Sequence, residues 1–155
     1  MTPSAELEQA GALTAEGMRL HEQGRVEEAR ARYRKALVFA PDHLAAVHLL
    51  ALAEAQGGDL VQAAELFEKV LSLSADDPVV HSNYASLLWT IGDSAQALTE
   101  VDIALRLNPY YAEAHHNRAT VLKNLGRGAE ALASYAKAIA DRKSTRLNSS
   151  HLGIS

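Results

Sequence analysis

Cysteine is absent from the 155 residues, and its absence excludes a disulfide framework, a thiolate metal site and a cysteine nucleophile. Only four prolines occur, widely scattered, and aromatic side chains make up only 5% of the chain. Alanine and leucine recur throughout instead, and both favour the α-helix. With 48% apolar residues, we expect a folded all-α protein rather than a disordered chain.

The sequence also lacks a long apolar run and an export signal. Its most apolar stretch, Leu44 to Ala53, is interrupted by His48 and followed by Glu54, far short of the roughly 20 residues that cross a bilayer. The first residues, MTPSAELEQAG, are acidic where a secretory signal is basic and then apolar. We therefore expect a soluble, cytoplasmic protein.

An internal repeat of 34 residues is the dominant feature of what is present. Two sets of small residues keep this interval over four copies: Gly24, Gly58, Gly92 and Gly126, and Ala29, Ala63, Ala97 and Ala131. A third position in the same frame holds Tyr33, Phe67, Val101 and Tyr135. Agreement of several positions over four copies indicates a repeat architecture.

The period and the order of residue types resemble the tetratricopeptide repeat family. The first copy shows the resemblance best, with Gly17, Gly24, Ala29, Tyr33, Ala36 and Pro41. The resemblance implies an all-α fold, a right-handed superhelical solenoid of four antiparallel helix pairs. It covers a domain of residues 1–140, with repeats at 10–43, 44–77, 78–111 and 112–140.

Local signals place the ends of the eight expected helices. Each repeat glycine is expected to close the first helix of its pair in a left-handed backbone conformation. Asp42, Asp59, Asp77 and Asp93 stand where N-caps are needed, and Pro78 suits a first turn. The helices are predicted at 4–22, 26–39, 43–56, 60–73, 78–90, 94–107, 112–124 and 128–140.

Residues 141–155 break the repeat frame. The run Asp141 to His151 resembles the conceptual translation of a common sequencing adapter, and Ile154 and Ser155 suit the continuation of that adapter. The alternative is a genuine polar, basic tail, and under either interpretation we expect these residues to be disordered. Without Asp141, Arg142, Lys143 and Arg146 the chain has 12 basic and 18 acidic residues, a net charge of −6. This charge argues against nucleic acid or an anionic membrane as the partner.

Two patterns that suggest chemistry have simpler explanations. The run Gly126 to Ala131 matches the dinucleotide fingerprint as a string, but helix is expected before it where the fingerprint needs a strand. Equivalent histidines, such as His48 and His116, are expected to lie too far apart for one metal ion. No nucleophile and base stand out together. We expect no catalytic residues, no metal and no cofactor.

The family resemblance implies that the first helix of each pair lines a concave groove that binds a peptide. The candidate groove residues, by position in the repeat, are His48, Ser82, Ser86, Trp89, His116, Thr120 and Lys123. Asn83 and Asn117 match the asparagine ladder with which O-linked N-acetylglucosamine transferases hold peptide backbones. Ala15 and Leu49 break this ladder in the first two copies. The lysines of the chaperone adaptors that bind a C-terminal carboxylate are missing.

Two functions remain open at this point. The first is a scaffold that binds a protein or peptide in the groove and catalyses nothing. The second is the substrate-recruiting segment of a larger glycosyltransferase or sulfotransferase, truncated after residue 140, because phrases such as VHSNYASLLWTIGD resemble repeats that precede such catalytic domains. Leu132, Tyr135 and Ile139 have no capping helix after them, so we also expect self-association through this end.

Overall fold

The computed structural model describes residues 1–151, and the side chains of residues 1–143. Within these residues the chain forms eight α-helices and no strand. The helices are α1 (Pro3–Glu22), α2 (Val26–Phe39), α3 (Leu44–Gln56), α4 (Leu60–Leu73), α5 (Pro78–Ile91), α6 (Ser94–Leu107), α7 (Ala112–Asn124) and α8 (Gly128–His151). The first seven agree with the predicted helices to within one residue at each end.

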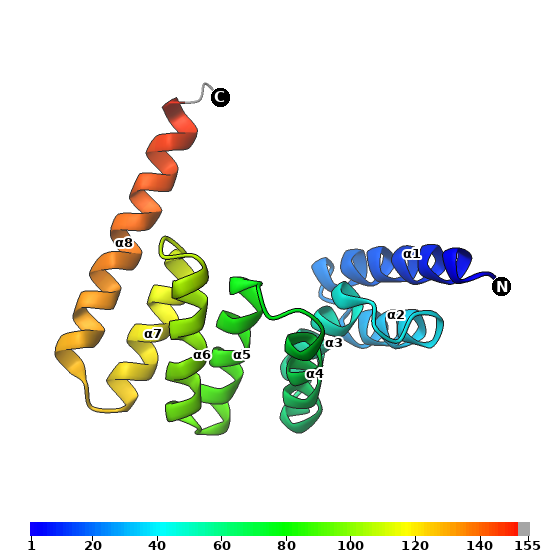
Figure 1. Ribbon diagram of the computed structural model, residues 1–155, viewed down its shortest axis with the longest axis horizontal. Coiled ribbons are helices and arrows are strands. Elements are labelled where there is room, and N and C mark those ends of the chain that lie inside the picture. Colours follow the sequence, from blue (N-terminus) through cyan, green and yellow to red (C-terminus); the bar gives the residue numbers. More distant parts are fainter. Residues whose placement is uncertain (152–155) are drawn as a thin grey trace. The chain divides into compact units, whose positions relative to one another are not determined.

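Consecutive helices pack as pairs within two compact units (Figure 1). The first unit, Met1–Ala75, holds the pairs α1/α2 and α3/α4, and the second unit, Asp76–Ser155, holds α5/α6 and α7/α8. Within each unit the second helix of one pair also packs on the first helix of the next. Each unit therefore consists of two stacked helical hairpins.

The repeat glycines turn the chain between the helices of each pair. Their φ angles are 77°, 88°, 101° and 76° for Gly24, Gly58, Gly92 and Gly126, in the left-handed region that glycine adopts without a Cβ clash. At Gly92 the backbone N–H donates to the carbonyls of Leu88 and Trp89, and this bond closes the end of α5. The predicted role of these glycines is confirmed.

Three of the four predicted N-caps are confirmed. Asp59, Asp77 and Asp93 each accept a hydrogen bond from a backbone N–H in the first turn of α4, α5 or α6. The prediction for Asp42 was wrong, since α3 is capped by His43, whose Nδ1 accepts from the N–H of Ala46 at 3.3 Å. Asp42 instead lies 3.7 Å from Lys69 Nζ.

Small residues at the paired-helix seams are buried, as the repeat frame predicts. Ala29, Ala63 and Ala97 are fully buried and Ala131 is 4% exposed. Tyr33, Phe67 and Val101 fill the space beside them and are equally buried. Close approach of the helices needs small side chains at one position and large ones opposite, and this alternation is what the repeat encodes.

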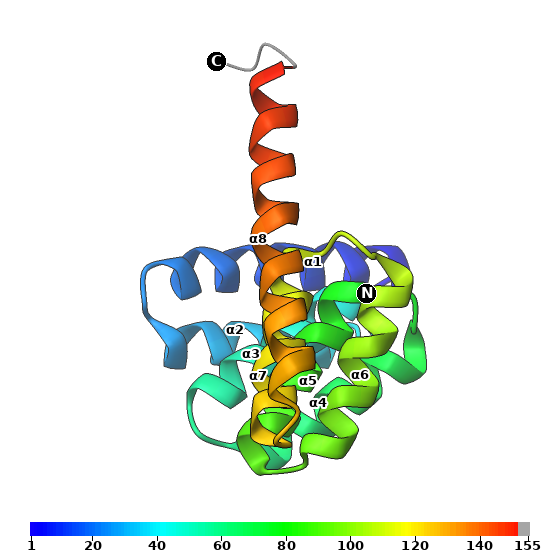
Figure 2. The ribbon, with the colours of Figure 1, turned by 90° about the vertical axis from the view of Figure 1, so that its left-hand side faces the viewer.

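Helix α8 is longer than predicted. It continues to His151, past the expected end at residue 140, so residues 141–151 are helical rather than disordered, and residues 152–155 lie outside the described residues. Asp141 explains part of this continuation, because its buried carboxylate lies 3.3 Å from Lys137 Nζ, one turn earlier, and 3.4 Å from His115 Nε2. Figure 2 shows α8 extending well beyond the helix it packs on.

Candidate functional site

The first helices of neighbouring pairs lie side by side within each unit, α1 with α3 and α5 with α7. In the second unit most of the candidate groove residues share this surface. Ser86 and Trp89 of α5, and His116 and Lys123 of α7, are exposed, and Thr120 is half-buried. We call these five residues the α5/α7 face. The indole of Trp89 is 39% exposed, so it is available to a partner.

Contacts within α7 and α8 hold two members of this face in place. The Thr120 hydroxyl donates to the carbonyl of His116 at 3.1 Å. The His116 ring meets the Tyr135 ring of α8 edge to face, with centroids 5.5 Å apart. Lys123 lies 34 residues after Trp89 and therefore occupies the equivalent position in the next repeat. The face therefore combines an indole, a cation and small polar groups.

Ser82 does not lie open to solvent as the groove prediction expects, and Asn117 is only partly exposed. Ser82 is fully buried and accepts a hydrogen bond at Oγ from Asn117 Nδ2, 2.9 Å away. The same amide nitrogen lies 3.4 Å from the Ser82 carbonyl oxygen. Ser82 thus holds the Asn117 amide rather than a partner, and Asn117 is half-buried beside it. Asn83, on α5, is also half-buried.

The first unit offers a different surface at the equivalent place. His48 is half-buried, with its ring edge-on to Phe67 at 5.9 Å. A pocket of about 220 Å³ lies between α1, α2 and α3, lined by Met18, His21, Glu22, Tyr33 and Leu49. His21 lies 3.3 Å from the Tyr33 hydroxyl through Nδ1 and 2.6 Å from Gln56 Oε1 through Nε2. Burial raises the pKa of Tyr33, and the negative charge of Glu22 raises it further.

The sequence did not predict this pocket, although two of the repeat positions around it, Gly17 and Leu49, differ from those in the other copies. Leu49 interrupts the asparagine ladder in the sequence, and in the structure it lines an apolar opening instead. Tyr33 reaches the pocket only because Gly17 beside it has no side chain. The 34-residue repeat identifies positions such as Gly17 and Leu49, but it does not show which of them lies beside a cavity.

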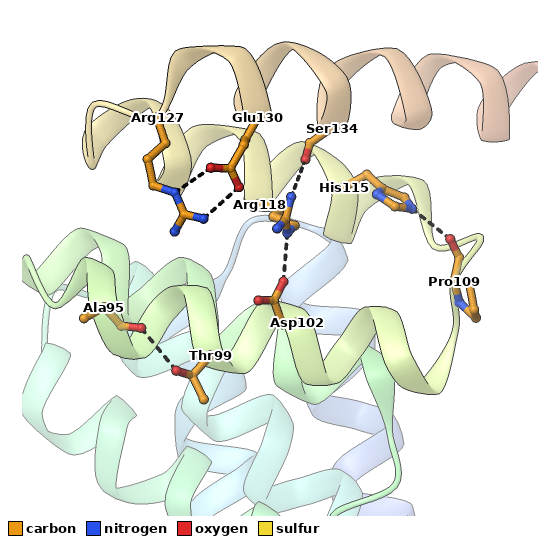
Figure 3. Close-up of polar contacts among 9 residues, drawn as sticks. All are labelled: Ala95, Thr99, Asp102, Pro109, His115, Arg118, Arg127, Glu130 and Ser134. Carbon is orange, nitrogen blue, oxygen red and sulfur yellow. Dashed lines mark hydrogen bonds and ion pairs between the residues drawn. The ribbon is translucent and has the colours of Figure 1, made fainter.

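Charged side chains that pair between helices are the other feature that the sequence did not indicate. Glu54 is fully buried in α3 and accepts hydrogen bonds from Arg30 and Arg34 of α2. In the second unit Arg118 of α7 donates to Asp102 of α6 at 2.8 Å and to Ser134 of α8 at 3.0 Å (Figure 3). These pairs hold helices together and do not form a catalytic arrangement.

Among residues 1–143, whose side chains the structure describes, no three His, Asp or Glu side chains lie in a group that could hold a metal ion. No helix in the same residues is long and apolar enough to cross a membrane.

Comparisons with known proteins agree on the fold. Two family models described as tetratricopeptide repeat match the chain, one over residues 14–78 and 85–145 and the other over residues 54–109. No curated protein matches. The crystal structure of MamA superposes with a TM-score of 0.80 at 14% identity, covering 88% of this chain and 80% of that chain. A second MamA structure, designated MSR-1, gives 0.74 at 22% identity, covering 88% and 78%.

A transferase is among the similar structures. A mutant O-GlcNAc transferase of Thermobaculum terrenum superposes with a TM-score of 0.71 at 26% identity. The match covers 79% of this chain but only 23% of the transferase chain. The shared part is therefore a minor segment of that enzyme.

Proposed function

Because the chain belongs to the tetratricopeptide repeat family, we propose that it is a protein-interaction scaffold whose α5/α7 face binds an extended peptide segment of a partner protein. The observation that carries the proposal is the exposure of Trp89 on a surface where two first helices lie side by side. Exposed tryptophans contribute a large share of binding energy at interfaces. The neighbouring Ser86 and Lys123 are exposed as well and supply polar contacts.

Asn117 fits a supporting role in this binding. Its Nδ2 is held by Ser82, which fixes the orientation of the amide. In that orientation Oδ1 serves as an acceptor for a peptide N–H, a contact that does not depend on the peptide's sequence. The Trp89 indole then supplies preference for one side chain. The arrangement favours peptides that combine an extended backbone with an apolar or aromatic anchor.

A peptide library displayed on phage tests the proposal. Peptides selected on the wild-type chain should lose at least about tenfold in affinity with Trp89→Ala, since hot-spot truncations cost about 2 kcal/mol or more. Trp89 is the single tryptophan, so its fluorescence should also shift when peptide binds. Val61→Ala, at a 71% exposed position of α4, is the matched control. Equal binding by Trp89→Ala and wild type would refute the assignment.

A second candidate function rests on the match to the transferase. We propose that this chain is a segment of a larger glycosyltransferase or sulfotransferase, in which the same face recruits substrate polypeptides for the catalytic domain. The match to a minor segment of an O-GlcNAc transferase and the placement of Asn117 favour this version. The full gene sequence tests it: a catalytic domain in the same reading frame after codon 140 supports recruitment, and a stop codon soon after a closing helix refutes it.

A further inference from the structure

A pocket of about 500 Å³ lies between α6, α7 and α8, and none of the predicted groove residues lines it. Its polar lining consists of Asp102, Arg106, His115, Arg118, Ser134 and Lys137. This volume falls within the range of ligand-binding pockets. On α7, His115 and Arg118 point about 140° around the helix from His116, Thr120 and Lys123, at 3.6 residues per turn. We call it the basic pocket, and it is separate from the α5/α7 face.

Two of the three cations in the basic pocket already have partners within the chain. Arg118 is fixed between Asp102 and Ser134, so it is held rigidly at the wall (Figure 3). Lys137 Nζ lies 5.4 Å above the Tyr110 ring and 3.3 Å from Asp141. Among the residues the structure describes, no carboxylate pairs with the exposed Arg106. The pocket therefore carries positive charge that its own acidic residues do not fully balance.

Asp141 shows which chemistry these cations accept. Its carboxylate is 5% exposed and lies against two residues of the pocket lining, Lys137 at 3.3 Å and His115 at 3.4 Å. His115 Nε2 lies 2.8 Å from the Pro109 carbonyl oxygen (Figure 3), and this contact fixes the ring. A side-chain carboxylate of the chain itself thus lies beside two residues of the lining, although Asp141 is not part of that lining.

We propose that the basic pocket binds the carboxylate side chains of an acidic peptide segment. Arg106 supplies a planar guanidinium group that can bind a carboxylate through two parallel hydrogen bonds, and Arg118, held by Asp102 and Ser134, adds positive charge at the wall. Leu105 and Ala133 supply apolar surface for the methylene groups of an aspartate or glutamate side chain. The net charge of −4 on the whole chain disfavours a long polyanion such as nucleic acid, whose charge extends beyond the pocket, more than a short acidic segment that contacts only the pocket.

Fluorescence anisotropy with labelled hexaglutamate at low ionic strength tests the proposal on the full chain. The wild-type chain should bind the peptide, and added salt should weaken binding because it screens the charges. Arg106→Glu should weaken binding at least about tenfold, since it places a like charge against the peptide. Arg106→Lys should lose only about two- to threefold, because it keeps the charge and loses the paired hydrogen bonds.

Two further variants separate this pocket from general charge effects. Lys35→Glu changes the charge by the same amount at an exposed position of α2 and should leave binding unchanged. Asp141→Asn removes a negative charge that lies against Lys137 and His115, so hexaglutamate should bind severalfold more tightly. Arg106 is exposed at the end of α6, so its variants should unfold as the wild-type chain does, which circular dichroism checks.

Several outcomes would overturn the proposal. Absence of hexaglutamate binding is one, and equal losses with Arg106→Glu and Lys35→Glu are another. If oligothymidylate of equal charge binds as tightly as hexaglutamate, the pocket binds nucleic acid rather than an acidic peptide. None of these measurements involves Trp89, so a negative result would not affect the peptide-binding proposal for the α5/α7 face. A negative result with Trp89→Ala would likewise not affect the proposal for the basic pocket.

Discussion

At the scale of single residues, buried charge is concentrated at Glu54 of α3. Its side chain has no exposed surface and lies 2.5 Å from Arg30 Nη2, with Arg34 as its second partner. The Arg30 side chain is only 13% exposed and also pairs with Glu27. A buried ion pair of this kind adds little net stability by itself, but removing one partner leaves the other charge buried and unpaired.

We therefore predict that Glu54→Ala destabilises the first unit by about 3 kcal/mol, within the range measured for broken buried ion pairs. Urea unfolding followed by circular dichroism measures the loss. Glu65→Ala is the matched control, since Glu65 is exposed on α4 and its removal should change the free energy of unfolding by less than about 0.5 kcal/mol. Similar stability of both variants would show that the Glu54 carboxylate is not enclosed as described.

Tyr111, at the N-terminus of α7, gives a prediction on pH dependence. Burial, followed by the charge of Glu113, raises the pKa of Tyr111 from 10.0 to about 12. The phenol donates a hydrogen bond to Glu113 Oε2 at 3.2 Å. Because the unfolded chain releases this proton near pH 10 and the folded chain only near pH 12, the folded state is progressively destabilised between these values.

We expect the urea midpoint of the wild-type chain to fall more steeply between pH 10 and 12 than that of Tyr111→Phe, which has no proton to lose there. Absorbance at the tyrosinate band should show one fewer late-titrating group in the variant. Identical pH profiles of the two chains would contradict the raised pKa.

At the scale of elements, each helix pair matches a small residue on its first helix to a large one on its second. In the first copy the pair is Gly17 and Tyr33, and a Cβ at Gly17 would lie 2.8 Å from Tyr33 Cδ1. The third copy has Ala85 with Val101 at the same places, so the smaller partner leaves room for the methyl group. In the first copy, therefore, Gly17 cannot become larger unless Tyr33 moves or becomes smaller.

We predict that Gly17→Ala destabilises the α1/α2 pair by about 1–2 kcal/mol through overpacking, in spite of the better helix propensity of alanine. In a Tyr33→Val background the same substitution should cost little, because the third copy shows that alanine fits beside valine. Thermal unfolding of the four chains of this double-mutant cycle measures the coupling.

Gly11→Ala controls for helix propensity in the same helix. A Cβ at Gly11 meets no atom within 4 Å, so this variant should be more stable than wild type by up to about 1 kcal/mol. Equal effects of Gly17→Ala in both backgrounds would show that the clash with Tyr33 does not limit the packing.

At the scale of the whole molecule, the last helix leaves large apolar side chains uncovered. Leu132 is 71% exposed and Ile139 is 65% exposed, while Tyr135 between them is half-buried against His116. Leu132 and Ile139 are seven positions apart, so they lie on one side of α8. Stacked repeats normally cover such a surface with a further helix.

We predict that this surface drives self-association, so the mass measured by light scattering should rise with protein concentration. The double variant Leu132→Lys/Ile139→Lys should be a monomer over the same range. Val61→Lys should associate as the wild-type chain does, since Val61 is equally exposed, at 71%, but stands on α4. A wild-type chain that stays monomeric at all concentrations would refute this role for α8.

The sequence by itself determined the fold of the chain. Its 34-residue period placed seven helices to within one residue. Several of their boundaries depend on local chemistry, either a glycine with positive φ or an aspartate that caps the next helix. The end of helix α8 was not predicted, and a contact of Asp141 with His115 of another helix explains only part of its continuation. Residues 141–151 carry no glycine or proline to stop it.

Only the tertiary structure decided which polar residues are enclosed. The repeat frame placed Ser82 on the groove side of its helix, yet the side chain is buried and holds Asn117. Glu54 and the basic pocket were equally hidden in the sequence, since their partners lie on other helices and no local pattern encodes those pairs. Periodicity reports the side of a helix, whereas burial and pairing depend on how neighbouring helices pack against it.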